Sequence, residues 1–168
     1  TPDARTALQL LDMLKKAQPS ERAVSFLDQF YRPIFLNGEG EPLPKFSAQT
    51  LDGQTITPDT YKGKNLVIAC VGTWQSDSRP LLTNLRRKLK SMNGKWQCVV
   101  VSLDVDHAIL RSSLKNDSIT FPTICDRQAF NSPLVKALGL HYVPSLMLVN
   151  AQGKIVQRDV VKIEDAKF

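Results

Sequence analysis

Long apolar runs are missing from this chain of 168 residues. The longest, Leu66 to Val71 and Val99 to Val101, are far shorter than the ~20 residues that a helix needs to cross a bilayer. No signal-peptide pattern opens the sequence, so we predict no membrane span in it. Because the sequence begins with Thr1 rather than Met, we expect a processed or truncated product.

Cysteine is scarce, and the three residues Cys70, Cys98 and Cys125 are too widely separated for a C-x-x-C metal or redox pair. Cys70 and Cys98 lie in apolar runs typical of buried strands, where a thiol behaves as a small, unreactive hydrophobe. Cys125 lies in Thr123–Arg127, a predicted loop or strand end. Its exposure and reactivity are left open by the sequence.

Histidine is scarcer still, and two residues, His107 and His141, with scattered cysteines cannot assemble a recognisable metal site. We therefore expect no metal and no cofactor. The 22 Lys and Arg exceed the 16 Asp and Glu, giving a net charge of +6. This modest excess permits an anionic partner but does not imply nucleic acid, and we expect the basic side of the helix after Arg79 to be a solvated face.

The composition, 42% hydrophobic and 23% charged, is that of a soluble globular protein. We predict a helical extension and linker over residues 1–40 and one domain over residues 41–168. The extension has apolar residues at helical spacing, and we expect them to pack on the main domain. These residues are Leu8, Leu11, Leu14, Leu27 and Phe30.

From Leu43 onward, strand and helix patterns alternate. The Asp52-Gly53 turn predicts a hairpin over residues 46–57. Strands are expected at 65–71, 98–103, 144–150 and 155–161, and helices at 78–92, 107–115 and 132–138. Because the central strands are too apolar to face water, this order predicts a mixed sheet between helices.

Several segments in this order resemble the thioredoxin-like superfamily, and most closely its exported TlpA/ResA-type thiol-disulfide oxidoreductase and redoxin (AhpC/TSA-like) branch. They are Leu43–Phe46, Tyr61–Lys64, Leu66–Trp74, Asn131–Leu140 and Val149–Val156. The resemblance implies a three-layer α/β/α sandwich with a central mixed sheet and an N-terminal hairpin. It also implies a cis peptide bond at Val143-Pro144, where the family has its cis-proline.

The sequence departs from the family at the chemistry. Where the family has Trp-Cys-x-x-Cys-Arg, this chain reads Trp74-Gln75-Ser76-Asp77-Ser78-Arg79. A carboxamide at Gln75 and a hydroxyl at Ser78 cannot replace the thiolate and the resolving thiol of dithiol exchange. We therefore predict no catalytic residue at these degenerate motif positions.

The leading hypothesis is a non-catalytic binding module that retains the groove of the fold. The resemblance implies a groove formed by Trp74, Gln75, Ser76, Asp77, Ser78, Val143 and Pro144. In active relatives an extended peptide pairs with the residue before the cis-proline, which here is Val143. The expected partner is a protein or an extended peptide, and the resemblance places the chain in the periplasm or elsewhere in the bacterial envelope.

Three alternatives remain. The first is an enzyme, either a thiol-disulfide oxidoreductase or a peroxide-reducing redoxin of cell redox homeostasis, working through Cys125 or a partner's cysteines. The second is a purely structural module of a longer protein. A hydrolase built from Ser76 or Ser78 with His141 and Asp77 has the right side-chain types but no G-x-S-x-G elbow, and Ser and Asp at a helix start are expected to be caps.

Overall fold

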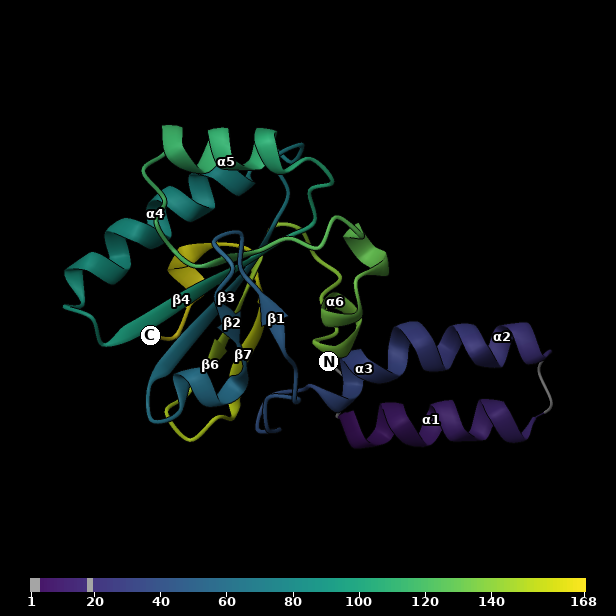
Figure 1. Cartoon of the computed structure of the whole chain (residues 1–168). Coiled ribbons are helices and arrows are strands. Elements are labelled where there is room, and N and C mark those ends of the chain that lie inside the picture. Colours follow the sequence, from purple (N-terminus) through teal and green to yellow (C-terminus); the bar gives the residue numbers. More distant parts are fainter. Residues whose placement is uncertain (1–3, 18–19) are drawn as a thin grey trace.

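A computed structural model describes residues 4–17 and 20–168 (Figure 1). Its centre is a five-stranded mixed sheet of order β5-β4-β3-β6-β7. β3 and β4 run parallel, as do β4 and β5, whereas β6 is antiparallel to both β3 and β7. The strands are β3 (Asn65–Val71), β4 (Trp96–Ser102), β5 (Thr123–Ile124), β6 (Ser145–Val149) and β7 (Ile155–Val160).

β3 lies in the middle of the sheet because its apolar run can be covered on both faces. Ile68 pairs with Val99 on one side and with Met147 on the other, and all three are almost fully buried. The parallel neighbour β4 is reached through α4 (Ser78–Ser91), the connection that parallel strands require. The loop that precedes α4 therefore begins at the C-terminal end of the central strand β3.

Helices cover both faces of the sheet, so the expected three-layer arrangement is confirmed (Figure 1). On one face, Leu81, Leu85 and Leu89 of α4 pack with apolar residues of the sheet and of the C-terminal segment that contains η4 (Ile163–Asp165). The other face is covered by α6 (Pro133–Ala137) and the hairpin of β1 (Ala48–Gln49) and β2 (Thr55–Ile56). The remaining elements are η2 (Pro58–Tyr61), η3 (Ala129–Asn131) and α5 (His107–Asn116), which lies beside α4.

The edge strand β5 was not resolved by the sequence pattern. Thr123 and Ile124 pair in parallel with Val100 and Val101, and Thr50 bridges Ile124 from the other side. Cys125, which directly follows this strand, is 7% exposed. The sequence left open whether Cys125 lies on the surface. The structure shows that it is buried, because the pairing of β5 with β4 holds the thiol against the carbonyl of Asp104.

The N-terminal region forms two antiparallel helical arms that project from the sheet domain (Figure 1). The first arm is α1 (Ala4–Lys16), and the second comprises α2 (Glu21–Phe26), the π-helical turn η1 (Leu27–Tyr31) and α3 (Arg32–Leu36). Ser20 caps the second arm by accepting a hydrogen bond from the Ala23 amide. We call these two arms the helical hairpin.

The five apolar residues expected to pack on the main domain have different environments: Leu14 is half exposed, Leu8 and Leu27 are partly buried, and Leu11 is buried. Leu10 and Met13 of α1 are also more than half exposed, so the expected docking is wrong for this side of α1. The side chain of Phe30 lies outside the described part of the structure. The predicted boundary at residue 40 stays a prediction, although Gly40, Glu41 and Leu43 already form backbone hydrogen bonds with Gly153 and Ile155.

Candidate functional site

The segment between β3 and α4 turns sharply just after the C-terminal end of the central strand. Backbone hydrogen bonds join the Gln75 amide to the Gly72 carbonyl and the Ser78 amide to the Gln75 carbonyl, each at 3.0 Å. The indole of Trp74 lies over Gly72, where an added Cβ would come within 2.5 Å of the ring. Trp74 is nevertheless 60% exposed, so the missing side chain at Gly72 leaves space for a solvent-facing aromatic platform.

Ser78 faces the protein interior. It is 2% exposed, and its hydroxyl accepts a hydrogen bond from the Gly72 amide at 3.2 Å. This bond closes the loop instead of capping α4, and the Asp77 side chain forms no cap bond either. The expected role of these two residues as helix caps is therefore wrong, because the tight turn brings Gly72 to the hydroxyl first.

A buried carboxylate supports the same loop from below. Asp104 accepts hydrogen bonds from the Thr73 amide at 3.1 Å, from the Thr73 hydroxyl and from the Ser102 hydroxyl at 2.6 Å. The Cys125 thiol donates to the Asp104 carbonyl at 3.0 Å, and His107 bonds to the Cys125 carbonyl at 2.8 Å. We call Thr73, Ser102 and Asp104 the buried brace.

The second wall of the site is the loop before β6. The peptide bond between Val143 and Pro144 is cis, the isomer predicted from the sequence. The Ser145 hydroxyl donates to the Tyr142 carbonyl at 2.8 Å, and His141 Nδ1 lies 2.9 Å from the Gly139 carbonyl. The loop is thus held by its own backbone carbonyls, with Tyr142 more than half exposed.

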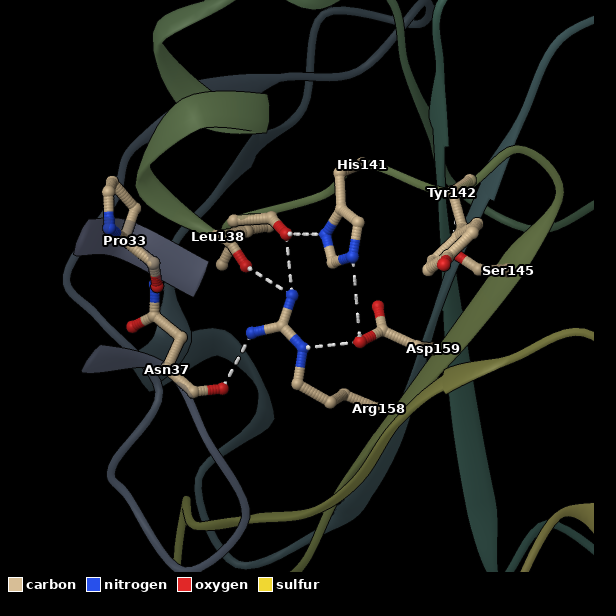
Figure 2. Close-up of polar contacts among 9 residues, drawn as sticks. Pro33, Asn37, Leu138, His141, Tyr142, Ser145, Arg158 and Asp159 are labelled. Atoms are coloured by element: carbon tan, nitrogen blue, oxygen red, sulfur yellow. Dashed lines mark hydrogen bonds and ion pairs between the residues drawn. The ribbon is translucent and has the colours of Figure 1, made fainter. Parts of the chain in front are cut away.

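Arg158 anchors this wall from beneath, as Figure 2 shows. Its guanidinium donates to the carbonyls of Gly139 at 2.5 Å and Asn37 at 2.7 Å, and it pairs with Asp159 at 3.2 Å. Positive charge is favourable at the C-terminal end of α6, where helix carbonyls lack internal partners. The same side chain therefore fixes both the start of the proline loop and the base of the helical hairpin.

A register shift in β7 allows this placement. Leu146 pairs with Val160 and Leu148 with Gln157, so the strand bulges at Arg158 and Asp159. Asp159 has a φ of 57°, a left-handed conformation in which aspartate is one of the more tolerant residues. Its carboxylate reaches His141 Nε2 at 3.9 Å, and Asn37 adds a side-chain bond to the Ala137 carbonyl at 2.6 Å.

A hollow of about 430 Å³ separates the two walls. Gln75 and Asp77 line it from one side, Val143 and Pro144 from the other, and the Gln75 carboxamide lies 3.4 Å from the Val143 carbonyl. We call this hollow the proline groove. Of the seven residues predicted to form it, Trp74, Ser76 and Ser78 lie outside the lining, because Trp74 covers Gly72 and Ser78 points into the core.

Sequence reasoning missed other residues that line the groove. Tyr142 precedes the predicted proline pair, a position that could have drawn attention to it. Pro80, Leu81 and Asn84 come from the first turns of α4, and Val161 to Glu164 come from the segment after β7. No local signal marks this last segment as part of the site, since only the return of the chain past the sheet brings it there.

The three thiols are poorly suited to chemistry in this groove. Burial raises the pKa of the Cys70 thiol to about 12 and also raises the pKa of Cys98. The pKa of Cys125 is raised as well, mainly by burial. No disulfide joins the three. Among the residues the structure describes, no group of three or more His, Cys, Asp or Glu could hold a metal ion.

The sequence profile of the AhpC/TSA family matches residues 40–158. The chain belongs to the AhpC/TSA family. It is 25% identical over 133 residues to the thiol-disulfide oxidoreductase ResA of Bacillus thuringiensis subsp. konkukian, an alignment that covers 76% of this chain and 72% of that protein. It is 24% identical over 122 residues to ResA of Bacillus subtilis, covering 71% of this chain and 65% of the relative.

Solved structures show the same fold for this AhpC/TSA-family chain. The C-terminal domain of a protein from Bacteroides thetaiotaomicron, named as a thiol-disulfide oxidoreductase, matches with a TM-score of 0.66 and 27% identity. That match covers 73% of this chain and 87% of the domain. A thiol-disulfide oxidoreductase from Bacteroides fragilis matches with a TM-score of 0.65 and 22% identity over 71% of this chain and 90% of its own.

In the part of the chain that the structure describes, no helix is long and apolar enough to cross a membrane. The resemblance to the thioredoxin-like redoxin branch is thus confirmed by the family profile, by the ResA relatives and by the fold.

Proposed function

We propose that this chain binds an extended peptide or protein segment non-covalently in the proline groove, without thiol-disulfide chemistry. The observation that carries the proposal is the composition of the groove. Gln75 and the Val143-Pro144 pair line one hollow, and none of the described residues that line it is a cysteine. The domain has the fold of its relatives, and the described residues that line the groove carry no sulfur atom.

Thiol-disulfide exchange requires a thiolate that attacks a disulfide and a second thiol that releases the product. The carboxamide of Gln75 is not a nucleophile of this kind. The hydroxyl of Ser78 is buried and already accepts a bond from Gly72. Cys70 lies within β3 with a pKa of about 12, so its thiolate is negligible at neutral pH.

The groove offers two features that suit a peptide. Val143 precedes β6, and its main chain lies at the groove wall, where an extended segment can add backbone hydrogen bonds in the manner of strand addition. Tyr142 in the lining of the groove, and Trp74 outside the lining on the loop that carries Gln75, are exposed aromatic side chains. Aromatic residues of this type supply much of the binding energy at protein interfaces.

The test is selection of peptides from a displayed random library on the whole chain, followed by affinity measurement with the selected peptides. Val143→Asp places a charge on a partly buried side chain that lines the groove and also packs against the core, so thermal unfolding must first verify that this variant is folded. The folded variant should weaken binding at least tenfold, and Tyr142→Ala, at an exposed side chain, should weaken it by about tenfold. Ile109→Ala, on exposed α5, is the matched control and should leave affinity unchanged. Equal binding by the control and both groove variants would refute the proposal.

The family relationship favours a second candidate, a thiol-disulfide oxidoreductase or peroxide-reducing redoxin that uses Cys125. This thiol donates to the Asp104 carbonyl, and the Asp104 carboxylate accepts a hydrogen bond from the Thr73 amide in the loop that carries Gln75. Insulin reduction and peroxide consumption by the parent chain distinguish the two functions. Substantial activity that disappears in Cys125→Ser would establish the enzyme and reject non-catalytic binding as the main role.

We also propose a location in the bacterial envelope, and the support is the similarity to ResA-type oxidoreductases. Cell fractionation of the full-length gene product in its native host tests this. Recovery with a cytoplasmic marker would refute it.

A further inference from the structure

The lining of the proline groove carries more negative than positive charge. Asp77 comes from the loop before α4, Glu164 from η4, and Lys162 from the residue that precedes η4. No other charged side chain occurs among the described residues that line the hollow. The groove thus presents two carboxylates and one ammonium group, whereas the whole chain has a net charge of +6.

Both carboxylates are exposed and unpaired. Asp77 directly precedes α4, but its side chain forms no cap bond with the helix. Among the residues that the structure describes, no salt bridge or side-chain hydrogen bond engages Asp77 or Glu164. A cation that enters the groove can therefore pair with either carboxylate without first breaking an ion pair within the chain.

Tyr142 adds a surface that suits a positive charge. Its side chain lines the groove and is 54% exposed. The face of a tyrosine ring attracts a Lys or Arg side chain that lies within about 6 Å of the ring centre. Carboxylates and an exposed aromatic ring in one hollow are suited to a cationic side chain and unsuited to an anionic one.

The rest of the lining is mainly apolar, and it faces the place where an extended segment would pair with the main chain of Val143. Successive side chains of an extended segment point to opposite sides, so alternate side chains of such a segment enter the groove. An apolar side chain gains free energy there by leaving water. The apolar residues of the lining are Pro80, Leu81, Val143, Pro144, Val161 and Ile163.

Building on the proposed function, we infer that the segment bound in the proline groove carries a Lys or Arg side chain beside apolar residues. The cationic side chain pairs with Asp77 and Glu164 and contacts the ring of Tyr142. The apolar side chains pack on Leu81 and Ile163. No covalent bond is made or broken, so binding is reversible.

The overall charge of the chain cannot produce this preference. At +6 the chain repels a basic peptide at long range. The helix α4, whose first turns line the groove, has five Lys and Arg residues and no acidic one. Charges in physiological salt interact over about 8 Å, so a basic peptide that binds here is held by the carboxylates that it contacts.

Selection from a displayed library of random peptides on the whole chain tests the inference. Lys and Arg should be enriched over the unselected library, and Asp and Glu should be depleted. A selected peptide is then synthesised with its Lys and, separately, with uncharged norleucine in place of that Lys. Titration calorimetry should show that the Lys peptide binds the parent about fivefold more tightly, near the upper limit for an exposed ion pair.

Charge-removing variants show whether the two carboxylates cause this difference. Asp77→Asn and Glu164→Gln should each weaken the Lys peptide about threefold and leave the norleucine peptide unchanged. Lys162→Gln should strengthen the Lys peptide about twofold, because a like charge is removed. Asp165→Asn is the matched control at an exposed aspartate outside the lining, and it should leave both affinities unchanged. Thermal unfolding verifies that each variant is folded.

The inference and the proposed function fail in different ways. Peptides that depend on Tyr142 but show no enrichment of Lys or Arg would support groove binding and overturn the inference alone. Equal affinity of the Lys and norleucine peptides would do the same, as would unaltered Lys-peptide affinity in a folded double variant Asp77→Asn, Glu164→Gln. Selected peptides that bind independently of both Tyr142 and Val143 would refute the proposed function and the inference together.

Discussion

Two aspartates show how differently this chain holds its two halves together. Asp104, at 5% exposure, lies under the loop between β3 and α4 and accepts three hydrogen bonds from Thr73 and Ser102. Asp28, whose side chain is 34% exposed, accepts bonds from Lys15 at 2.5 Å and Arg32 at 2.9 Å across the helical hairpin. Both carboxylates are fully engaged, but only one is shielded from water.

The difference in burial between these two aspartates determines how much each contributes to stability. Removing a buried acceptor leaves its donors without water or another partner, which costs about 1–3 kcal/mol for each group. An exposed ion pair contributes about 0–1 kcal/mol, because water and salt replace it readily. The loop between β3 and α4 is therefore held rigidly, whereas the helical hairpin is held by contacts that solution conditions can weaken.

The largest expected effect comes from Asp104→Ala. The Thr73 amide and hydroxyl and the Ser102 hydroxyl lose their acceptor together, so the free energy of unfolding should fall by about 3–4 kcal/mol. Urea denaturation measures this. The control Asp106→Ala removes only the exposed N-cap of α5 and should cost about 1 kcal/mol; equal losses in the two variants would contradict the importance of the buried brace.

Arg158→Met should have the next largest effect. Methionine preserves the aliphatic stem but leaves the carbonyls of Asn37 and Gly139 without their guanidinium partner, at an expected cost of about 2–3 kcal/mol. Hydrogen exchange should also increase around Asn37 and residues 138–141. Arg87→Met, at an exposed arginine of α4, should change stability by less than about 0.5 kcal/mol. Unchanged hydrogen exchange near Asn37 would show that Arg158 does not hold the base of the helical hairpin.

The double variant Gln75→Cys, Ser78→Cys should lose less stability than the two variants above and should gain thiol-disulfide exchange. Loss of the Ser78 hydroxyl bond to Gly72 should destabilise the fold by about 1 kcal/mol. The new dithiol at the start of α4 should form a reducible disulfide and reduce insulin, because the helix N-terminus favours a thiolate. Single Gln75→Cys is the control without a resolving thiol. Failure of the pair to oxidise would show that this loop does not hold the place of the redox motif.

The smallest effect concerns the hairpin at low pH. Hydrogen bonds from Lys15 and then Arg32 lower the pKa of Asp28 below its ordinary 3.8. Its contribution to stability is therefore present above pH 3.8 and is lost as the pH falls through the lowered value. Amide chemical shifts of α1 and α2 should change in that range, and more readily in high salt, while those of β3 and β4 stay constant. Simultaneous changes in both regions would contradict independent loosening.

Prediction from the sequence succeeded where the pattern is local. The run from Asn65 to Val71 was recognised as a central strand because neighbouring apolar residues suffice to define it. The position of Val143-Pro144 beside Gln75 followed from the family resemblance, and the structure brings both to one hollow. The inward orientation of Ser78 was missed, since it depends on how the tight turn presents the Gly72 amide.

The central strands and helices along the chain, their apolar faces and the lack of a C-x-x-C pair were determined by the sequence alone, because hydrophobic periodicity and residue identity are properties of short segments. Tertiary structure decided the rest. It buried Cys125 beside Asp104, brought Val161 to Glu164 to the proline groove and left the helical hairpin projecting with Leu14 exposed. These outcomes depend on contacts between residues far apart in the chain, whose partners no local pattern specifies.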